Sequence, residues 1–213
     1  MMSLSTFSKA SYNGSALRNR EPIFNVLKDY LPASGTVLGV ASGTGTHVSY
    51  FAPLCPDLTW QPTDYDAAQL TTIDGNISLV GATNVLPAMQ LDASSSDWRF
   101  APASFSLVYN INMIHISEWE CTIGLMNGAG KYLKDGGILL TYGPYSVGGI
   151  ISPASNVQFD ESLKSRNANW GIRAVEDVKD AAARNSLEFK EMIAMPANNF
   201  CLVFQKQATG ASK

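Results

Sequence analysis

Short apolar runs rich in β-branched residues alternate with helix-like stretches along this chain, and that alternation restricts its fold more than any other feature. Parallel strands need a crossover connection between them, which is usually a helix. Strands that alternate with helices therefore predict a parallel sheet covered by helices on both faces. The last two apolar runs have no helix between them and should pair as an antiparallel hairpin. The sequence thus predicts a three-layer α/β fold with a mostly parallel sheet.

The expected elements follow from apolar periodicity and from the positions of Gly and Pro. Strands are predicted over residues 36–41, 58–62, 84–91, 105–111, 138–142, 187–194 and 200–205. Helices are predicted over 23–31, opened by Pro22, and over 46–52, 66–76, 118–133 and 175–185. A proline inside the 84–91 run places that strand near the sheet edge.

The remaining segments complete a single predicted domain, residues 1–213. Residues 1–20 are expected to form an N-terminal arm. The polar stretch 143–171 is long for a connection inside a compact domain, which favours a lid over a substrate.

Charge and composition exclude several classes of partner. The net charge is −3 and Lys and Arg are not clustered, which argues against nucleic acid. Three widely spaced cysteines, Cys55, Cys121 and Cys201, indicate reduced thiols, and two histidines supply a zinc site poorly, so no metal is predicted. No apolar run is long enough to span a bilayer, and the N-terminus lacks the apolar core of a signal peptide. We therefore expect a cytoplasmic protein with no membrane partner; its oligomeric state stays open.

The turn Ala41-Ser42-Gly43-Thr44-Gly45 follows a buried strand and opens a helix, where glycines let a ligand approach the backbone. Glycine pairs also serve turn geometry alone. Asp64, 21 residues after Gly43, has the spacing of a carboxylate that binds a ribose diol. Asp92, after the third strand, is expected to flank an adenine. Together these residues favour a cofactor that contains a nucleoside.

The choice of cofactor depends on one position. A dinucleotide fingerprint needs a third glycine three residues after Gly45, where this chain has Val48. That difference favours S-adenosyl-L-methionine, with Ala41, Gly43, Thr44 and Gly45 as binding residues.

Several blocks of sequence resemble one family. They are RNREPI (18–23), ASGTGTH (41–47), WQPTD (60–64), NINMIHIS (110–117), YGPY (142–145), SNVQFDESL (155–163), WGIR (170–173) and MPANN (195–199). Over about residues 8–205 the chain is similar to the methyltransferase-like 26 family, also called UPF0585 or DUF938. The resemblance implies a class I, Rossmann-like S-adenosylmethionine-dependent methyltransferase fold, with seven strands and an antiparallel C-terminal hairpin. It implies no particular substrate.

Position 39 departs from the family pattern, which has glutamate before ASGTG where this chain has Gly39. In class I methyltransferases that acid usually helps to hold the methionine ammonium of the cofactor. The loss of one charge-assisted hydrogen bond weakens binding by roughly tenfold to a hundredfold. Gly39→Glu is therefore expected to tighten S-adenosylmethionine, provided that the strand end has room for the side chain.

In the implied fold, the end of the fourth strand faces the reactive sulfonium. Asn110 and Asn112 are candidates to accept from the methionine ammonium or to orient a substrate, and they share a face only if the strand stays regular. His115 is a candidate general base for a hydroxyl, with a capping or core histidine as the equal alternative. Tyr142 and Tyr145 border the start of a substrate loop, or pack at a sheet edge.

Four other residues complete the candidate site. Trp170, with Phe159, gives the predicted lid an apolar inner face. Asn198 and Asn199 supply either turn geometry or substrate contacts. Arg18 either closes over the cofactor carboxylate or lies in a solvated arm.

Two functions fit these observations. The first is methyl transfer to a small molecule, with an apolar or aromatic substrate favoured over a macromolecule. The second is a methyltransferase fold that no longer methylates and instead cyclises, rearranges or only binds a small molecule. Gly39 motivates the second hypothesis.

Overall fold

A computed structural model of the chain describes Tyr12 and residues 14–208. Its main sheet has seven strands in the order β3-β2-β1-β4-β5-β9-β8. These strands are β1 (Gly35–Val40), β2 (Leu58–Asp64), β3 (Met89–Gln90), β4 (Phe105–Ile111), β5 (Leu133–Gly143), β8 (Leu187–Met195) and β9 (Asn199–Lys206). The first five are parallel, and β9 runs antiparallel to both β5 and β8. The predicted mostly parallel sheet with its antiparallel hairpin is confirmed.

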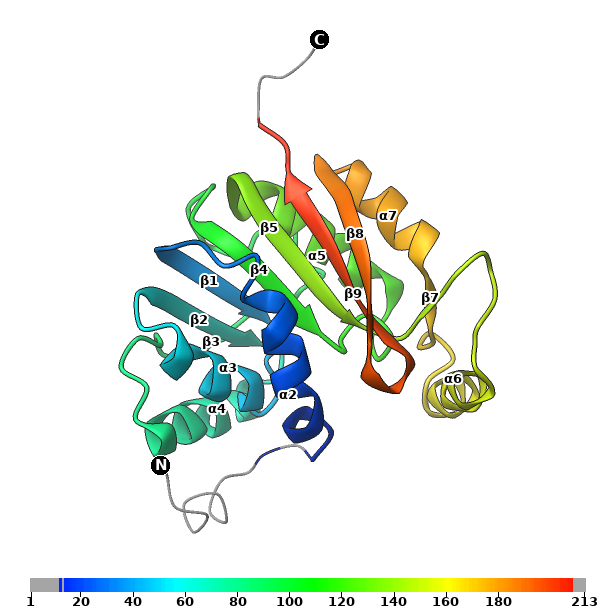
Figure 1. Cartoon of the computed structure of the whole chain (residues 1–213), viewed down its shortest axis with the longest axis horizontal. Coiled ribbons are helices and arrows are strands. Elements are labelled where there is room, and N and C mark those ends of the chain that lie inside the picture. Colours follow the sequence, from blue (N-terminus) through cyan, green and yellow to red (C-terminus); the bar gives the residue numbers. More distant parts are fainter. Residues whose placement is uncertain (1–11, 13, 209–213) are drawn as a thin grey trace.

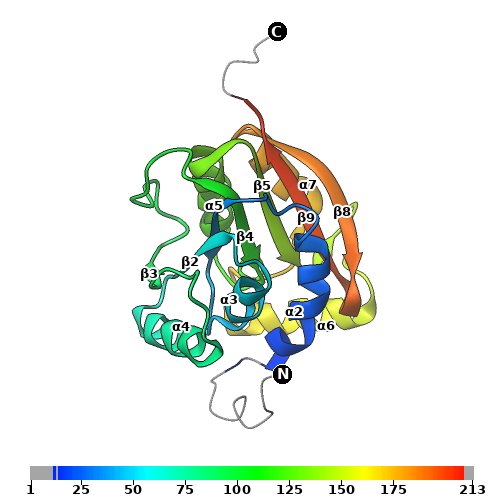
Figure 2. The same ribbon diagram turned by 60° about the vertical axis from the view of Figure 1, so that its left-hand side comes forward.

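Helices cover both faces of the sheet (Figures 1 and 2). One face carries α2 (Gly14–Leu27), α3 (Thr46–Phe51) and α4 (Ala67–Val80), and the other carries α5 (Trp119–Tyr132) and α7 (Val175–Ala183). A short 3₁₀ turn, η1 (Ala52–Leu54), continues α3. A second one, η2 (Pro196–Asn198), joins β8 to β9 in the final hairpin.

Alternate residues of the central strands enter two separate cores. Val37 of β1 packs with α2, α3 and α4, whereas Leu38 packs with α5 and α7. Leu107 and Val108 of β4 divide in the same way. A strand buried on both faces reads as a continuous apolar run, which is why these strands were predictable.

Three segments differ from expectation. The first helix begins at Gly14 and contains Pro22, so Pro22 does not open it. The arm expected over residues 1–20 is therefore helical from Gly14 onward. Residues 1–11 and 13 lie outside the described part of the chain. Polar residues dominate the first turns of α2, and so apolar periodicity did not reveal them. The predicted strand 84–91 reduces to β3 at the sheet edge, because Pro87 interrupts the run.

The 143–171 segment has secondary structure of its own. It contains β6 (Tyr145–Ser146) and the helix α6 (Ala154–Arg166), and β6 pairs with β7 (Arg173–Ala174) in a small second sheet. Figure 1 shows α6 beside the carboxyl end of the sheet. Asp160 on α6 accepts from the backbone amide of Ile172 at 2.8 Å, which fixes α6 against the chain that follows it.

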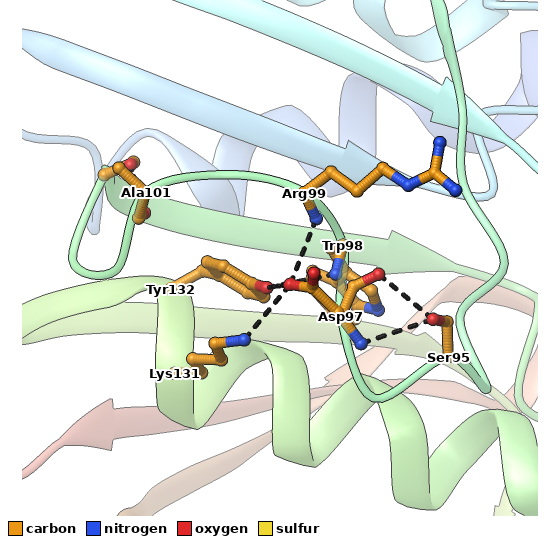
Figure 3. Close-up of polar contacts among 8 residues, drawn as sticks. Ser95, Asp97, Trp98, Arg99, Ala101, Lys131 and Tyr132 are labelled. Atoms are coloured by element: carbon orange, nitrogen blue, oxygen red, sulfur yellow. Dashed lines mark hydrogen bonds and ion pairs between the residues drawn. The ribbon is translucent and has the colours of Figure 1, made fainter.

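The loop between β3 and β4 is anchored to the end of α5 (Figure 3). The Asp97 carboxylate accepts from Tyr132 Oη at 2.5 Å and from Lys131 Nζ at 3.1 Å. Tyr132 Oη in turn accepts from the backbone amide of Trp98 at 3.0 Å, and the two rings stack with centroids 5.5 Å apart. These contacts position the loop that contains Asp92. In the described part of the chain, no helix is long and apolar enough to cross a membrane.

Candidate functional site

A cavity of about 680 Å³ opens at the carboxyl ends of β1, β2, β3 and β4. Its walls are the glycine turn after β1, the residues that follow the other three strands, the start of α2 and the residues Asn167 and Trp170 after α6. The carboxyl edge of an open α/β sheet is where such folds bind ligands. The volume lies within the usual range for small-molecule sites.

The glycine turn leaves its backbone open to this cavity. Ala41, Gly43 and Gly45 all have positive φ, at 57°, 57° and 73°. A Cβ at Gly43 would meet nothing within 4 Å, whereas one at Gly45 would lie 3.1 Å from Ile73 of α4. Gly45 is therefore required by packing, and Gly43 leaves space where a ligand can approach the main chain.

Asp64 and Asp92 both line the cavity. Asp64 Oδ2 accepts from the Gly43 amide at 2.7 Å, and Oδ1 accepts from the Asp66 amide at 3.0 Å. Burial raises the pKa of Asp64, while these two hydrogen bonds lower it. Asp92 accepts from the amide and hydroxyl of Ser94 at 2.8 and 2.7 Å. The structure thus brings together the glycine turn and the two carboxylates that the sequence singled out.

The end of β4 separates the two candidate asparagines. Asn112 has φ 65° and lines the cavity, and its backbone N–H donates to the Tyr142 carbonyl at 2.9 Å. Asn110 is fully buried, donates from Nδ2 to the Val40 carbonyl at 3.0 Å and is not part of the cavity wall. Its Nδ2 thus ties β4 to β1, while its buried Oδ1 has no hydrogen-bond partner among the described residues, and a contact of Asn110 with a ligand stays a prediction. The strand ends at Ile111, so the two asparagines do not share a regular face.

His115 lies outside the cavity wall and is packed in the interior. Its ring meets Phe159 of α6 edge-on with centroids 5.5 Å apart, and its carbonyl accepts from the Gly171 amide at 3.0 Å. Burial, with Arg173 and Arg166 nearby, lowers its pKa to about 4. The placement agrees with the alternative of a core histidine, and the role of a general base stays a prediction.

His47, which was not among the residues predicted from the sequence, lines the cavity instead. It is the second residue of α3, and its Nε2 lies 2.9 Å from Asn19 Oδ1 on α2. Burial, with a smaller effect from Arg20, lowers its pKa to about 4. Its position two residues after Gly45, at the mouth of the predicted turn, was the signal available in the sequence.

The other candidates divide between two places. Trp170 lines the cavity, whereas Tyr145, Asn198 and Asn199 border a separate cavity of about 470 Å³ between β6 and η2. Tyr145 is buried with its hydroxyl 2.9 Å from Thr141 Oγ1. The Asn199 side chain donates to the carbonyls of Pro196 and Ala197, as turn geometry requires.

Tyr142 and Arg18 do not line the main cavity either. Tyr142 is buried at the end of β5, where it is hydrogen-bonded to the Asn19 side chain. Arg18 is exposed on α2.

Position 39 has no room for a side chain. A Cβ at Gly39 would lie 2.5 Å from Tyr109 Oη and 3.0 Å from Ser42 Oγ. Tyr109 is buried, and its ring packs against Phe51 and Trp60. The condition attached to Gly39→Glu is not fulfilled, so that substitution is not expected to strengthen cofactor binding.

The sheet order and the cavity at its carboxyl edge define a Rossmann-like methyltransferase fold, and solved structures agree. An O-methyltransferase family protein from Burkholderia thailandensis superposes with a TM-score of 0.76 at 17% identity, over 90% of this chain and 57% of that one. The geranyl diphosphate C-methyltransferase of Streptomyces coelicolor A3(2), crystallised with S-adenosyl-L-homocysteine, gives 0.71 at 13%, over 87% and 76%. An O-methyltransferase family 2 protein from Planctomyces limnophilus DSM 3776, in complex with apigenin, gives 0.69 at 18%, over 92% and 66%.

Residues 10–206 match the family model described as "Protein of unknown function (DUF938)", and the chain belongs to that family. It spans little more than half the length of the Burkholderia thailandensis protein. Among the described residues, no group of three or more His, Cys, Asp or Glu is arranged to hold a metal ion.

Proposed function

We propose that this chain is an S-adenosylmethionine-dependent methyltransferase that acts on a small molecule. The observation that carries the proposal is the cavity in which the open backbone at Gly43 meets the carboxylates of Asp64 and Asp92. These groups suit a nucleoside: carboxylates accept from hydroxyl and amino groups, and the turn admits close approach of the ligand to the backbone.

The charge of the cavity supports the same ligand. Asp64, Asp92 and Glu118 line it, and none of its described lining residues is Lys or Arg. A cavity with this charge attracts a cation such as a sulfonium and disfavours substrates that carry phosphate or carboxylate. Apolar side chains, among them Met113, Ile116 and Trp170, complete the wall. Small apolar or aromatic substrates without negative charge therefore fit best.

When bound, S-adenosylmethionine would supply an electrophilic methyl group. The chain's own contribution would be to align the acceptor and to exclude water, which is the main source of rate in such transfers. Asn112, which lines the cavity after the end of β4, is a polar side chain placed for that alignment.

The direct test measures transfer of a labelled methyl group across a panel of small neutral, cationic and anionic acceptors. Calorimetry with S-adenosylhomocysteine accompanies it, using Asp64→Asn and, as the matched control, Asp57→Asn on the exposed loop before β2. Asp64→Asn is expected to weaken binding by roughly tenfold or more, since it removes a charged acceptor. Absence of binding to the wild-type protein would contradict the proposal.

A second candidate function is catalysis or binding without methyl transfer. Tyr109 fills the space that an acid at position 39 would need, so this chain lacks the usual carboxylate partner of the methionine ammonium. Turnover of a substrate without added cofactor, and without a mass gain of one methyl group, would establish this alternative. Strict dependence on the cofactor with a methylated product would exclude it.

A further inference from the structure

His47 lines the cavity, and its two ring nitrogens differ in their hydrogen-bond partners. Its Nε2 is hydrogen-bonded to Asn19 Oδ1 at 2.9 Å, and no described residue pairs with its other nitrogen, Nδ1. Because Nε2 is engaged by Asn19 of α2, Nδ1 is the ring nitrogen of this cavity-lining residue that is left to accept from a ligand.

The Asn19 side chain determines which nitrogen of His47 carries the hydrogen. Asn19 is also hydrogen-bonded to Tyr142, whose pKa burial raises and this hydrogen bond lowers. The atom of Asn19 that faces His47 Nε2 is the amide oxygen, Oδ1, which can only accept. The hydrogen of His47 therefore sits on Nε2, and Nδ1 is an acceptor.

Most of the other polar side chains around the glycine turn already have hydrogen-bond partners, and the buried oxygens Asn110 Oδ1 and Ser49 Oγ have none among the described residues. Ser42 Oγ lies 3.3 Å from both the Gly39 carbonyl and the Thr63 amide. The hydroxyls of Thr44 and Thr46 are 2.9 Å apart and bond to each other. Both oxygens of Asp64 accept from backbone amides.

We propose that His47 Nδ1 accepts a hydrogen bond from the ammonium group of the methionine tail of S-adenosylmethionine, in place of the carboxylate that position 39 lacks. The inference rests on the proposed function and identifies the residue that compensates for Gly39. Because burial and Arg20 lower the pKa of His47 to about 4, the imidazole is neutral near pH 7 and free to accept. The Arg20 guanidinium itself lies over the ring of Tyr50, 4.6 Å from the ring centroid.

Calorimetry with two ligands separates the tail from the nucleoside. S-Adenosylhomocysteine carries the amino-acid tail, whereas adenosine lacks it. We expect His47→Phe to weaken S-adenosylhomocysteine by about tenfold to a hundredfold, the effect of one charge-assisted hydrogen bond, with adenosine unchanged. His47→Gln, which keeps an acceptor, should retain most of the affinity. Asn112→Gly tests the competing acceptor at the end of β4, since glycine tolerates the φ of 65° at that position.

A measurement on the unmodified protein complements the variants. The chain has two histidines, so two-bond ¹H–¹⁵N correlation spectra of histidine-labelled protein resolve both rings. We expect an unprotonated Nδ1 on His47 in the free protein and a shift of its ¹⁵N resonance with S-adenosylhomocysteine but not with adenosine. His115, which lies outside the cavity wall, serves as the internal reference.

The outcomes distinguish the two proposals. If wild type binds both ligands but His47→Phe weakens them equally or not at all, the inference about His47 is wrong and the proposed function stands. A tail-specific loss in Asn112→Gly alone would likewise overturn it, as would a hydrogen on Nδ1 in the free protein. If wild type binds neither ligand, the proposed cofactor site and the inference both fail.

Discussion

The hydroxyl of Tyr109 occupies the space into which any side chain at Gly39 would have to extend. Its Oη lies 2.5 Å, and its Cζ 2.7 Å, from the position of a Cβ at residue 39. The two residues face each other directly in neighbouring strands, since β1 and β4 pair at Gly39 and Tyr109. A small residue on one strand and a large one on the other thus form a matched pair in the core.

The first prediction is that positions 39 and 109 are energetically coupled. Gly39→Ala should lower the free energy of unfolding by about 1–3 kcal/mol, because an added methyl group overpacks a filled core. In a Tyr109→Leu background the same change should cost much less, since the ring it meets is gone. Urea unfolding of both single variants and the double variant measures the coupling. Additive effects of the two changes would refute it.

The second prediction concerns Gly124, which lets α5 approach the β3–β4 loop. A Cβ at Gly124 would lie 2.7 Å from Ser94 Cα and would also contact the Ala93 carbonyl, and both residues line the cavity. Gly124→Ala should therefore destabilise the protein and weaken nucleoside binding, because the backbone beside Asp92 must move. Gly75→Ala in α4, where a Cβ meets nothing within 4 Å, is the matched control and should stabilise by roughly 0.5–1 kcal/mol. Thermal unfolding and adenosine calorimetry on both variants test the contrast.

The third prediction concerns the attachment of α6. The buried Asp160 carboxylate accepts from the Ile172 amide and, at 2.6 Å, from Lys164 Nζ. Asp160→Ala leaves that amide unpaired, and loss of one hydrogen bond to a charged group costs about 1.5–3 kcal/mol. In Asp160→Ala, hydrogen exchange at Ile172 and in α6 should accelerate. Glu161→Ala, which changes the exposed neighbouring residue, is the control and should leave the exchange rates unchanged. Equal exchange in both variants would show that other contacts hold α6.

The fourth prediction is a pH dependence of stability from His115. Burial and two arginines hold its folded pKa at about 4, below the usual 6.5, so the unfolded chain binds the proton first as the pH falls. Stability contributed by the neutral ring is complete above about pH 6.5 and is lost progressively down to about pH 4. Between pH 7.5 and pH 5 the loss from this residue is about 2 kcal/mol.

His115→Gln should reduce the change in unfolding free energy between these two pH values by that amount. Because the other titrating groups, including His47 and Asp64, are present in both proteins, their contributions cancel in the comparison. Urea unfolding at pH 5 and pH 7.5 provides the measurement. The same pH dependence in the variant would mean that His115 titrates normally in the folded protein.

The sheet was predictable from the sequence because strands buried on both faces are continuous apolar runs. Residues 105–111 match β4 without error, and the helix between Gly45 and the second strand was located correctly. The start of α2 and the helix α6 were missed for the opposite reason. Both are polar over most of their length, and α6 buries three residues: Asn156, Asp160 and Leu163. Periodicity of apolar residues carries little signal in such helices.

The candidate site was predictable where backbone geometry determines it and unpredictable where side-chain direction does. The turn at Gly43 and the carboxylates of Asp64 and Asp92 follow from strand ends and spacing. The histidines could not be distinguished in this way, because each follows a strand end within a few residues. His47 enters the cavity wall and His115 packs under α6, a difference that depends on tertiary packing alone.

Neither outer strand of the main sheet offers a good template for another chain. On one side β3 has two residues, and on the other β8 is bulged between Phe189 and Glu191. The exposed residues of β8 include Glu188 and Lys190, whose side chains lie 3.6 Å apart. Short, bulged and charged edges oppose edge-to-edge pairing and the aggregation that follows from it. Any self-association of this protein should then proceed through a helical face, and its sheet should remain the same size in every assembly.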